Sequence, residues 1–284
     1  MEILKLEHVS CIYGAKTPFE ITALYNVSVG FEKGKITGVI GHTGSGKSTL
    51  VSMLNGLLKP TSGKVLLDGK DIWEKPKEIG KVRYRVGLVM QYPEYQLFDE
   101  TVRADIGYAP RNMKLPEEEI AVRVREAAAF VGLSEELLDK SPLELSGGQK
   151  RRAALAGVIA MRPEILVLDE PAAGLDPRGK AEIFEGLLKY RDSYGATVII
   201  VSHSMEDMAR YTENVVVMKG ARVVKTGTVA EIFSEDHLLS EAGLDIPVMV
   251  RLAKELSRRG IDLSGELYTV EGFRRAVANA LNKN

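Results

Sequence analysis

The sequence predicts an α/β protein with a strand-rich N-terminal part, an inserted helical subdomain and a small helical appendage at the C-terminal end. Three observations lead to this prediction. Short runs rich in β-branched residues fill the first third of the 284-residue chain. Apolar residues then recur at helical spacing between Pro116 and Met161. Beyond them, continuous apolar runs at Ile165–Leu168 and Val198–Val201 are typical of parallel strands buried on both faces.

The predicted elements follow one another in a definite order. Turn residues separate five strands in the first part, at Ile3–His8, Ala23–Phe31, Lys35–Ile40, Lys64–Leu67 and Val82–Met90. Arg178–Arg191 is expected to form the crossover helix between the two later strands. We therefore divide the chain into a core of residues 1–233, interrupted by a helical subdomain at about residues 92–162, and an appendage of residues 234–284.

Composition limits the classes of partner. The formal net charge is -1, so the basic excess of a nucleic-acid-binding protein is absent from the sequence. Met1–Ser10 alternates apolar and charged residues, unlike a secretory signal. Ala153–Met161 is the longest uncharged apolar stretch and is far shorter than the roughly 20 residues that span a bilayer. At a membrane, the protein would need another chain to hold it. The single Cys11 fits a reducing compartment or a core position.

The first motif that carries chemistry follows the apolar strand Ile36–Ile40 and fits the pattern G-x-x-x-x-G-K-[ST]. Its glycines let consecutive N–H groups face one anion, and a helix from Lys47 to Leu54 would point its positive end at the same phosphates. The lysine adds charge for the terminal phosphates, and the hydroxyl of Ser48 can ligate Mg²⁺. A merely flexible glycine turn is the alternative. The predicted phosphate-binding residues are Gly41, His42, Thr43, Gly44, Ser45, Gly46, Lys47, Ser48 and Thr49.

A second motif consists of two carboxylates, Asp169 and Glu170, at the end of the predicted strand Ile165–Leu168. In a nucleotide hydrolase, Asp169 is suited to hold Mg²⁺ through water, and Glu170 to polarise the attacking water as general base. On their own, the two acids could instead cap a helix that begins at Pro171, which is the less favoured alternative.

The third motif is the pentapeptide Leu145–Gln149, which leads into a predicted helix, Lys150–Met161. Its members Ser146, Gly147, Gly148 and Gln149 expose N–H groups at a helix start, which makes a second anion site in a chain that already has one. Over residues 1 to about 230, the sequence resembles the ATP-binding cassette (ABC) family, whose signature is this pentapeptide. The resemblance implies an ABC-type P-loop ATPase core and a head-to-tail dimer, in which the pentapeptide of one subunit closes over ATP bound by the other.

Four further positions match the family, and each has an ordinary structural alternative. The resemblance implies that Tyr13 stacks on adenine, although a half-buried strand tyrosine is the default. It implies that Gln91 reaches Mg²⁺ and the attacking water, that Asp176 crosses the dimer interface, and that His203 hydrogen-bonds the γ-phosphate. The catalytic residues implied are thus Glu170, His203 and Gln91, the metal-holding residues are Ser48, Gln91 and Asp169, and the cofactors are ATP and Mg²⁺.

The run Gln91–Phe98 indicates a particular branch of the ABC family. Its aromatic and aliphatic side chains could form a groove for an amphipathic helix of a membrane partner or belong to the subdomain core. The run resembles the ATPases of energy-coupling factor (ECF) transporters, and Lys16–Glu20, Ala23–Tyr25, Ser204–Asp207 and Gly243–Pro247 are similar to their second, A-prime type. This resemblance implies a heterodimer with a related ABC ATPase, attached peripherally at the cytoplasmic face of the cell membrane. Its partners would be a transmembrane coupling protein and a substrate-binding membrane subunit, and its role uptake of vitamins or transition-metal ions.

Three other functions compete with this interpretation. A soluble ABC ATPase acting on DNA or ribosomes would carry a coiled-coil insertion or a second cassette, and the sequence has neither. A GTPase would carry an N-K-x-D motif, whereas the only Asn-Lys pair is Asn282–Lys283. A nucleotide-binding interaction module without turnover remains the third alternative.

Overall fold

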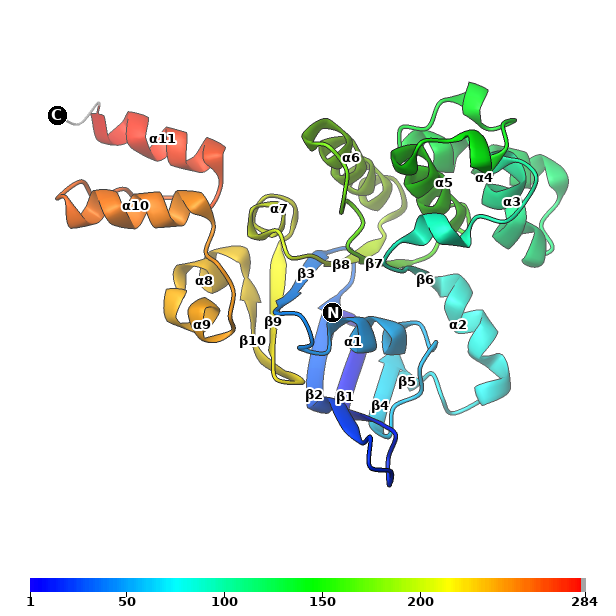
Figure 1. Cartoon of the computed structure of the whole chain (residues 1–284), viewed down its shortest axis with the longest axis horizontal. Coiled ribbons are helices and arrows are strands. Elements are labelled where there is room, and N and C mark those ends of the chain that lie inside the picture. The colour runs from blue at the N-terminus through cyan, green and yellow to red at the C-terminus, as the bar shows by residue number, and fades with distance from the viewer. Residues whose placement is uncertain (282–284) are drawn as a thin grey trace.

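Two sheets with different strand directions form the centre of the protein (Figure 1). The computed structural model describes residues 1–281. The Asn282–Lys283 pair and the last three residues of the predicted appendage lie outside this range. The α/β class predicted from the sequence is correct.

The first sheet is antiparallel and has the order β2-β1-β4-β5. Its strands are β2 (Ile21–Glu32), β1 (Glu2–Tyr13), β4 (Ser62–Leu67) and β5 (Lys70–Asp71). Apolar side chains of β1, including Leu4 and Leu6, are buried against the rest of the protein. Tyr13 lies opposite Ile21 in the β1–β2 register, so the end of β1 lies beside the start of β2.

The second sheet has the order β10-β9-β3-β8-β7-β6. Its strands are β10 (Arg222–Thr228), β9 (Asn214–Lys219), β3 (Ile36–Gly41), β8 (Thr197–Val201), β7 (Ile165–Asp169) and β6 (Val86–Val89). All neighbours from β9 to β6 are parallel, and only β10 runs antiparallel to its neighbour. Every residue of β3, β7 and β8 is buried, as expected for strands covered on both faces. Because parallel strands end at the same edge, this sheet brings together residues that are far apart in the sequence.

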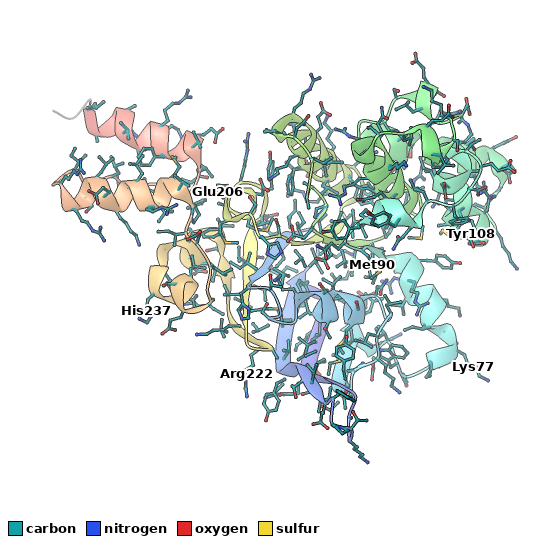
Figure 2. The ribbon with its side chains drawn as sticks, viewed as in Figure 1. Lys77, Met90, Tyr108, Glu206, Arg222 and His237 are labelled. Carbon is teal, nitrogen blue, oxygen red and sulfur yellow. The ribbon has the colours of Figure 1, made fainter. Side chains whose placement is uncertain are left out.

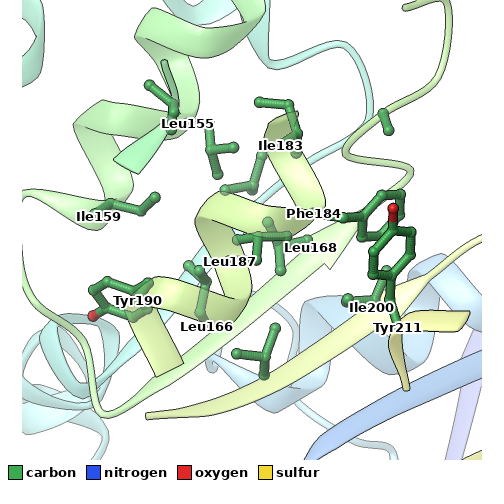
Figure 3. Packing of buried hydrophobic residues seen from close by; sticks show 14 of the residues in the cluster. Leu155, Ile159, Leu166, Leu168, Ile183, Phe184, Leu187, Tyr190, Ile200 and Tyr211 are labelled. Carbon is green, nitrogen blue, oxygen red and sulfur yellow. The ribbon is translucent and has the colours of Figure 1, made fainter. Parts of the chain in front are cut away.

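Helices cover the two faces of the parallel sheet. α1 (Lys47–Leu54) packs between the two sheets, where Leu50 and Leu54 are buried. On the other face, α6 (Pro177–Tyr194) lies between the sheet and α5 (Gly147–Ile159), as Figure 3 shows. The rings of Phe184 and Tyr211 stack there with centroids 4.4 Å apart, which ties α6 to α7 (Met205–Tyr211).

The remaining helices form two groups that are separate in Figure 1. α3 (Val102–Asn112) and α4 (Glu117–Phe130) pack beside α5. Toward the C-terminus, α8 (Val229–Ser234) and α9 (Asp236–Glu241) precede α10 (Val248–Arg258) and α11 (Val270–Leu281). In Figure 2, Glu206 of α7 lies beside the start of α10, and its Oε1 accepts a hydrogen bond from Val248 N (3.4 Å). The boundaries 1–233, 92–162 and 234–284 stay predictions.

The structure corrects one predicted strand. Val82–Met90 was expected to be extended, but α2 (Ile79–Arg85) occupies its first part and β6 only Val86–Val89. The short 3₁₀ turn Pro76–Glu78 leads into α2. The last residue of α2, Arg85, pairs with Asp68 and Glu164. The strand prediction rested on the local pattern of β-branched residues, which gives no information about these long-range ion pairs.

Several helix predictions also change. α3 was not predicted, because Gly107 and Pro110 are poor helix formers; its N-cap Thr101 accepts a hydrogen bond from Ala104 N (3.2 Å). The helix expected at Lys150–Met161 is α5, which begins three residues earlier at Gly147. 3₁₀ turns at Pro93–Gln96, Glu135–Leu137 and Pro142–Glu144 complete this region. Strands β9 and β10 were not predicted either. By contrast, the helix expected from Lys47 to Leu54 has the predicted ends.

Within residues 1–281, none of the helices is long and apolar enough to cross a membrane.

Close packing of α6 on the end of α4 gives a test of this architecture. A Cβ added at Gly186 would lie 1.7 Å from the carbonyl oxygen of Phe130. We expect Gly186→Ala to lower the free energy of unfolding by about 1–3 kcal/mol, because the two helices must separate. The matched control is Gly80→Ala in α2, where a Cβ meets nothing within 4 Å and helix propensity should stabilise the protein by about 0.5–1 kcal/mol. Denaturant unfolding measures the change in the free energy of unfolding of each variant. Changes of the same sign in both variants would contradict close packing of α6 against Phe130.

Candidate functional site

The phosphate loop, Gly41–Thr49, lies at the carboxyl end of β3 and continues into α1. Gly46 is the N-cap of α1 and has a φ of 102°, and a Cβ there would lie 2.4 Å from the carbonyl oxygen of Ala23. A side chain therefore has no room at this point. Because the cap has no side chain, the first N–H groups of α1 are left to bind an external acceptor. The loop is thus built as an anion site at a helix N-terminus.

Lys47 places a positive charge inside the loop. Its buried Nζ donates hydrogen bonds to Gly41 O (2.6 Å) and His42 O (3.0 Å). Burial lowers the pKa of this ammonium group, while the nearby carboxylates of Glu170 and Asp169 act in the opposite direction. The loop therefore holds a cation whose solvation by water has been replaced by fixed carbonyl groups.

Two carboxylates lie near this cation at the carboxyl end of β7, which β8 separates from β3. Asp169 is the last residue of β7, and its Oδ2 accepts a hydrogen bond from Ser48 Oγ (2.9 Å). Burial raises the pKa of Asp169, and the Ser48 hydrogen bond and the charge of Lys47 oppose that rise. A serine hydroxyl and an aspartate carboxylate thus meet at the point where the phosphate loop enters α1.

Glu170 follows directly and has a left-handed backbone conformation, with φ of 52°. One carboxylate oxygen, Oε2, lies 3.5 Å from the donor Ser202 Oγ. The other, Oε1, is buried 3.1 Å from Nε2 of His203 but makes no hydrogen bond of acceptable geometry within residues 1–281. Burial, and then the charge of Asp169, raise the pKa of Glu170 to about 7. Burial and the charge of Lys47 lower the pKa of His203, so its imidazole is neutral at neutral pH.

A cavity of about 410 Å³ joins these groups. Tyr13 borders it from the end of β1, where its hydroxyl lies 3.3 Å from Thr49 Oγ1. Gln91 reaches it from beyond β6. The predicted site residues that line the cavity are Tyr13, Thr43, Gly44, Gly46, Lys47, Ser48, Thr49, Gln91, Asp169, Glu170 and His203. A larger hollow of about 550 Å³, between α7 and the C-terminal helices, contains none of the predicted site residues.

Sequence reasoning missed part of the cavity wall. Ile21, Thr22 and Ala23 of β2 line it beside Tyr13. The only signal for them is the β1–β2 register, which puts Ile21 opposite Tyr13. Ser202 was also missed, although it stands immediately before His203 and donates to Glu170.

Three residues of the phosphate loop, Gly41, His42 and Ser45, do not line the cavity. A Cβ at Gly41 would lie 2.5 Å from the carbonyl oxygen of Met218, so this glycine permits close approach of β9. Ser45 is buried, and Nδ1 of His42 lies 2.6 Å from Thr43 O. These positions shape the loop.

The signature segment, Leu145–Gln149, does not reach the cavity of its own chain. Ser146 caps α5 by accepting a hydrogen bond from Gln149 N (3.3 Å), and Gln149 Oε1 accepts one from Ser146 N (2.9 Å). Ser146 and Gly147 are exposed. Asp176 is also away from the cavity, where it caps α6 by accepting a hydrogen bond from Gly179 N (2.6 Å). The structure thus presents a second, exposed helix N-terminus that its own phosphate loop does not use.

The site offers oxygen ligands for a hard cation. Within the described chain, no group of three or more His, Cys, Asp or Glu residues is arranged to hold a metal ion. Ser48, Asp169 and Gln91 nevertheless face one cavity, and Oε1 of Glu170 is buried there without a hydrogen bond among residues 1–281. Such a sparse set of oxygen donors fits Mg²⁺, which commonly keeps several waters and is shared with substrate phosphates.

Comparison with known proteins shows the family to which the chain is similar. The family model described as ABC transporter matches residues 24–173. The energy-coupling factor transporter ATP-binding protein EcfA2 of Clostridium perfringens is 48% identical over 282 residues, which cover 99% of each chain. The protein of the same name from Caldanaerobacter subterraneus is 50% identical, over 98% of this chain and 97% of its own.

Two solved structures are also similar. CbiO1 of Clostridium perfringens, described as part of the ABC transporter complex cbiONQ, is 41% identical with a TM-score of 0.75; the match covers 89% of this chain and 99% of CbiO1. The ATP-binding cassette MJ0796, in a dimeric post-hydrolysis state with ADP and Pi, is 30% identical with a TM-score of 0.73, over 80% of this chain and 98% of its own.

The buried carboxylate of Glu170 predicts a pH-dependent stability. Its folded-state pKa of about 7 exceeds the ordinary 4.5, so the folded protein binds more protons than the unfolded chain between these values. The free energy of unfolding therefore loses this contribution as the pH rises from about 4.5 to 7. Glu170→Gln removes this ionisable group. The free energy of unfolding of the variant minus that of wild type should therefore be about 2–3 kcal/mol larger at pH 8 than at pH 5. Denaturant titrations at both pH values measure this. The exposed Glu100→Gln is the control, and an equal pH response in both variants would contradict the assignment.

Proposed function

Because the chain belongs to the ABC transporter family, and within it to the energy-coupling factor transporter ATP-binding proteins, we propose that its ATP hydrolysis drives uptake through a membrane partner. As a member of this family, the protein is an ATP-binding ATP hydrolase. The observation that carries the proposal is the single cavity that joins the phosphate loop, the carboxylates of Asp169 and Glu170, and His203.

ATP lies with its phosphates on the phosphate loop and its adenine against the exposed face of Tyr13. The N–H groups at the start of α1 and the ammonium group of Lys47 bind the phosphates. Gln91 and His203 hydrogen-bond the γ-phosphate region from opposite walls of the cavity. Ser48, Asp169 and Gln91 would hold Mg²⁺, which neutralises charge that develops on the phosphate oxygens.

Glu170 is the general base. Glu170 lines the cavity, and its Oε1 makes no hydrogen bond with any described residue, so this oxygen can accept a proton from the attacking water. A pKa near 7 suits this role, because the group is then ionised in part at neutral pH and still basic enough to take a proton. The neutral imidazole of His203 can donate to or accept from the phosphate without adding a charge.

The signature segment completes the site of a second subunit. Ser146, Gly147 and the N-terminus of α5 form an exposed anion site that faces away from their own cavity. A head-to-tail dimer with a related ABC ATPase gives each bound ATP two phosphate cradles, and Asp176 lies at the contact between the subunits. This arrangement is supported by the dimeric form of the similar cassette MJ0796.

A transmembrane coupling protein contacts the aromatic surface formed by Tyr92, Tyr95, Phe98 and Tyr108. All four side chains are exposed, with Tyr95 at 85% and Phe98 at 67%, and the rings of Phe98 and Tyr108 meet edge to face at 4.9 Å. Such a surface suits the apolar side of an amphipathic helix. The protein is then peripheral at the cytoplasmic face of the cell membrane, in a complex whose substrate-binding membrane subunit takes up vitamins or transition-metal ions. The CbiO1 relative is described as part of an ABC transporter complex.

Replacing the proposed base tests the chemistry. We expect Glu170→Gln to reduce steady-state phosphate release about 10²–10⁴-fold, because the amide cannot accept a proton from water. ATP binding and ATP-dependent dimerisation should persist. Phosphate release, binding of a fluorescent ATP analogue and light scattering measure the three properties, with exposed Glu74→Gln as the control. Unchanged hydrolysis in Glu170→Gln would remove this residue from the mechanism.

Membrane coupling has its own test. The chain should co-purify from membranes with a transmembrane partner when neighbouring candidates are co-expressed, and Tyr95→Ser combined with Phe98→Ser should reduce recovery at least tenfold by removing apolar contact area. The control is Phe19→Ser, which removes an equally exposed aromatic side chain (82%) from the β1–β2 turn. Recovery of the wild-type chain only as a soluble species would argue strongly against the coupling role.

A further inference from the structure

A buried ion pair joins the turn after Gln91 to the helix that carries the signature segment. Arg151 of α5 donates from Nε and Nη2 to the two carboxylate oxygens of Glu94, each at 3.1 Å. The side chains are only 5% and 19% exposed, so among the ion pairs of the described residues this one is the most deeply buried. The two parallel hydrogen bonds fix both the distance and the relative orientation of the two segments.

The position of the pair relates it to three functional parts of the chain. Glu94 stands three residues after Gln91, which lines the nucleotide cavity, and directly before the exposed Tyr95. Arg151 stands two residues after Gln149, in the second turn of α5. Neither Glu94 nor Arg151 lines the nucleotide cavity. The pair therefore connects the nucleotide cavity, the aromatic surface and the signature segment without belonging to any of them.

The turn also has a conformation that needs support. Tyr92 has a left-handed φ of 57°, and its ring lies 6.0 Å from the guanidinium carbon of Arg151. A non-glycine residue keeps such a conformation only where its surroundings hold it. The guanidinium of Arg151 contacts both the tyrosine ring and Glu94, so α5 supports the turn at two points.

We propose that Glu94 and Arg151 are positioning residues that make the turn 92–98 and the start of α5 move as one unit. Closure of the signature segment on the ATP of a partner ATPase then displaces the aromatic surface with it. The identity of what that surface contacts rests on the proposed function, whereas the mechanical link is a property of this chain alone. A buried ion pair suits this purpose, because its geometry specifies one arrangement while a hydrophobic contact would allow sliding.

Hydrogen exchange of the chain with and without Mg-ATP tests the link. In wild type, ATP should slow exchange of the amides of residues 95–98 at least fivefold, because bound ATP holds Gln91 before the turn and the Glu94–Arg151 pair ties the turn to α5. In Glu94→Gln and in Arg151→Met, ATP should change this exchange less than twofold. Binding of a fluorescent ATP analogue should stay within twofold of wild type in both variants, since neither residue lines the cavity.

Two comparisons separate positioning from simple support of the fold. Glu182→Gln breaks the pair between α6 and Arg152, the next residue of α5, and should keep the wild-type response. The double variant Glu94→Gln/Arg151→Met should lose no more protection than either single variant, because the two residues act as a unit. Wild-type protection in the single variants would overturn the proposal. So would a rise in exchange that is equal with and without ATP, which indicates a structural role only. Since the test uses no membrane partner, its result is independent of the co-purification experiment.

Discussion

The site depends on one constraint, the burial of two adjacent carboxylates at the carboxyl end of β7. Removing carboxylates from water is unfavourable, and the raised pKa values of Asp169 and Glu170 express that cost. The sheet keeps the two carboxylates from moving into water, because β7 is paired on both sides and Glu170 N donates to Val201 O at 3.0 Å. Lys47 and Ser48 of the phosphate loop then offset part of the cost, so the loop and the strand end stabilise each other's position.

This arrangement leaves the site open on one side. Residues at or just beyond the carboxyl ends of β3, β6, β7 and β8 line the cavity, all at one edge of the sheet. The N-terminus of α5, at Ser146 and Gly147, is exposed and carries its own capping box. A ligand bound between two such half-sites stabilises the associated state over the separated one. In the dimer that we propose, the same contacts would link nucleotide occupancy to subunit association, so hydrolysis would change the shape of the assembly.

Sequence patterns predicted those parts of the site whose conformation is determined by residues close together in the chain. The phosphate loop and the helix Lys47–Leu54 follow from a strand, closely spaced glycines and a helix start, all within twenty residues. The strand before Asp169 follows from a continuous apolar run. By contrast, Ile21 enters the cavity only through the register of β1 against β2. The Glu94–Arg151 pair joins residues 57 positions apart, and no periodicity in either segment indicates it. α3 was hidden because its glycine and proline oppose helix formation, and packing against α4 and α5 overrides that preference.

Nine residues other than glycine have a left-handed backbone conformation within residues 1–281, and two of them lie at strand ends beside the site. Tyr92 and Glu170 both adopt left-handed conformations just after neighbouring strands, β6 and β7, end. Each conformation costs about 1 kcal/mol or more in a residue other than glycine. Glycine would relieve the strain at position 170, but it would also remove the carboxylate that faces the cavity. The strain therefore persists because the sharp turn directs Glu170 inward, and the hydrogen bond to Val201 O and the donor Ser202 hold it there. At Tyr92 no group of the cavity explains the turn, whereas Arg151 contacts both its ring and Glu94. The left-handed conformation is thus stabilised by the sheet at Glu170 and by α5 at Tyr92.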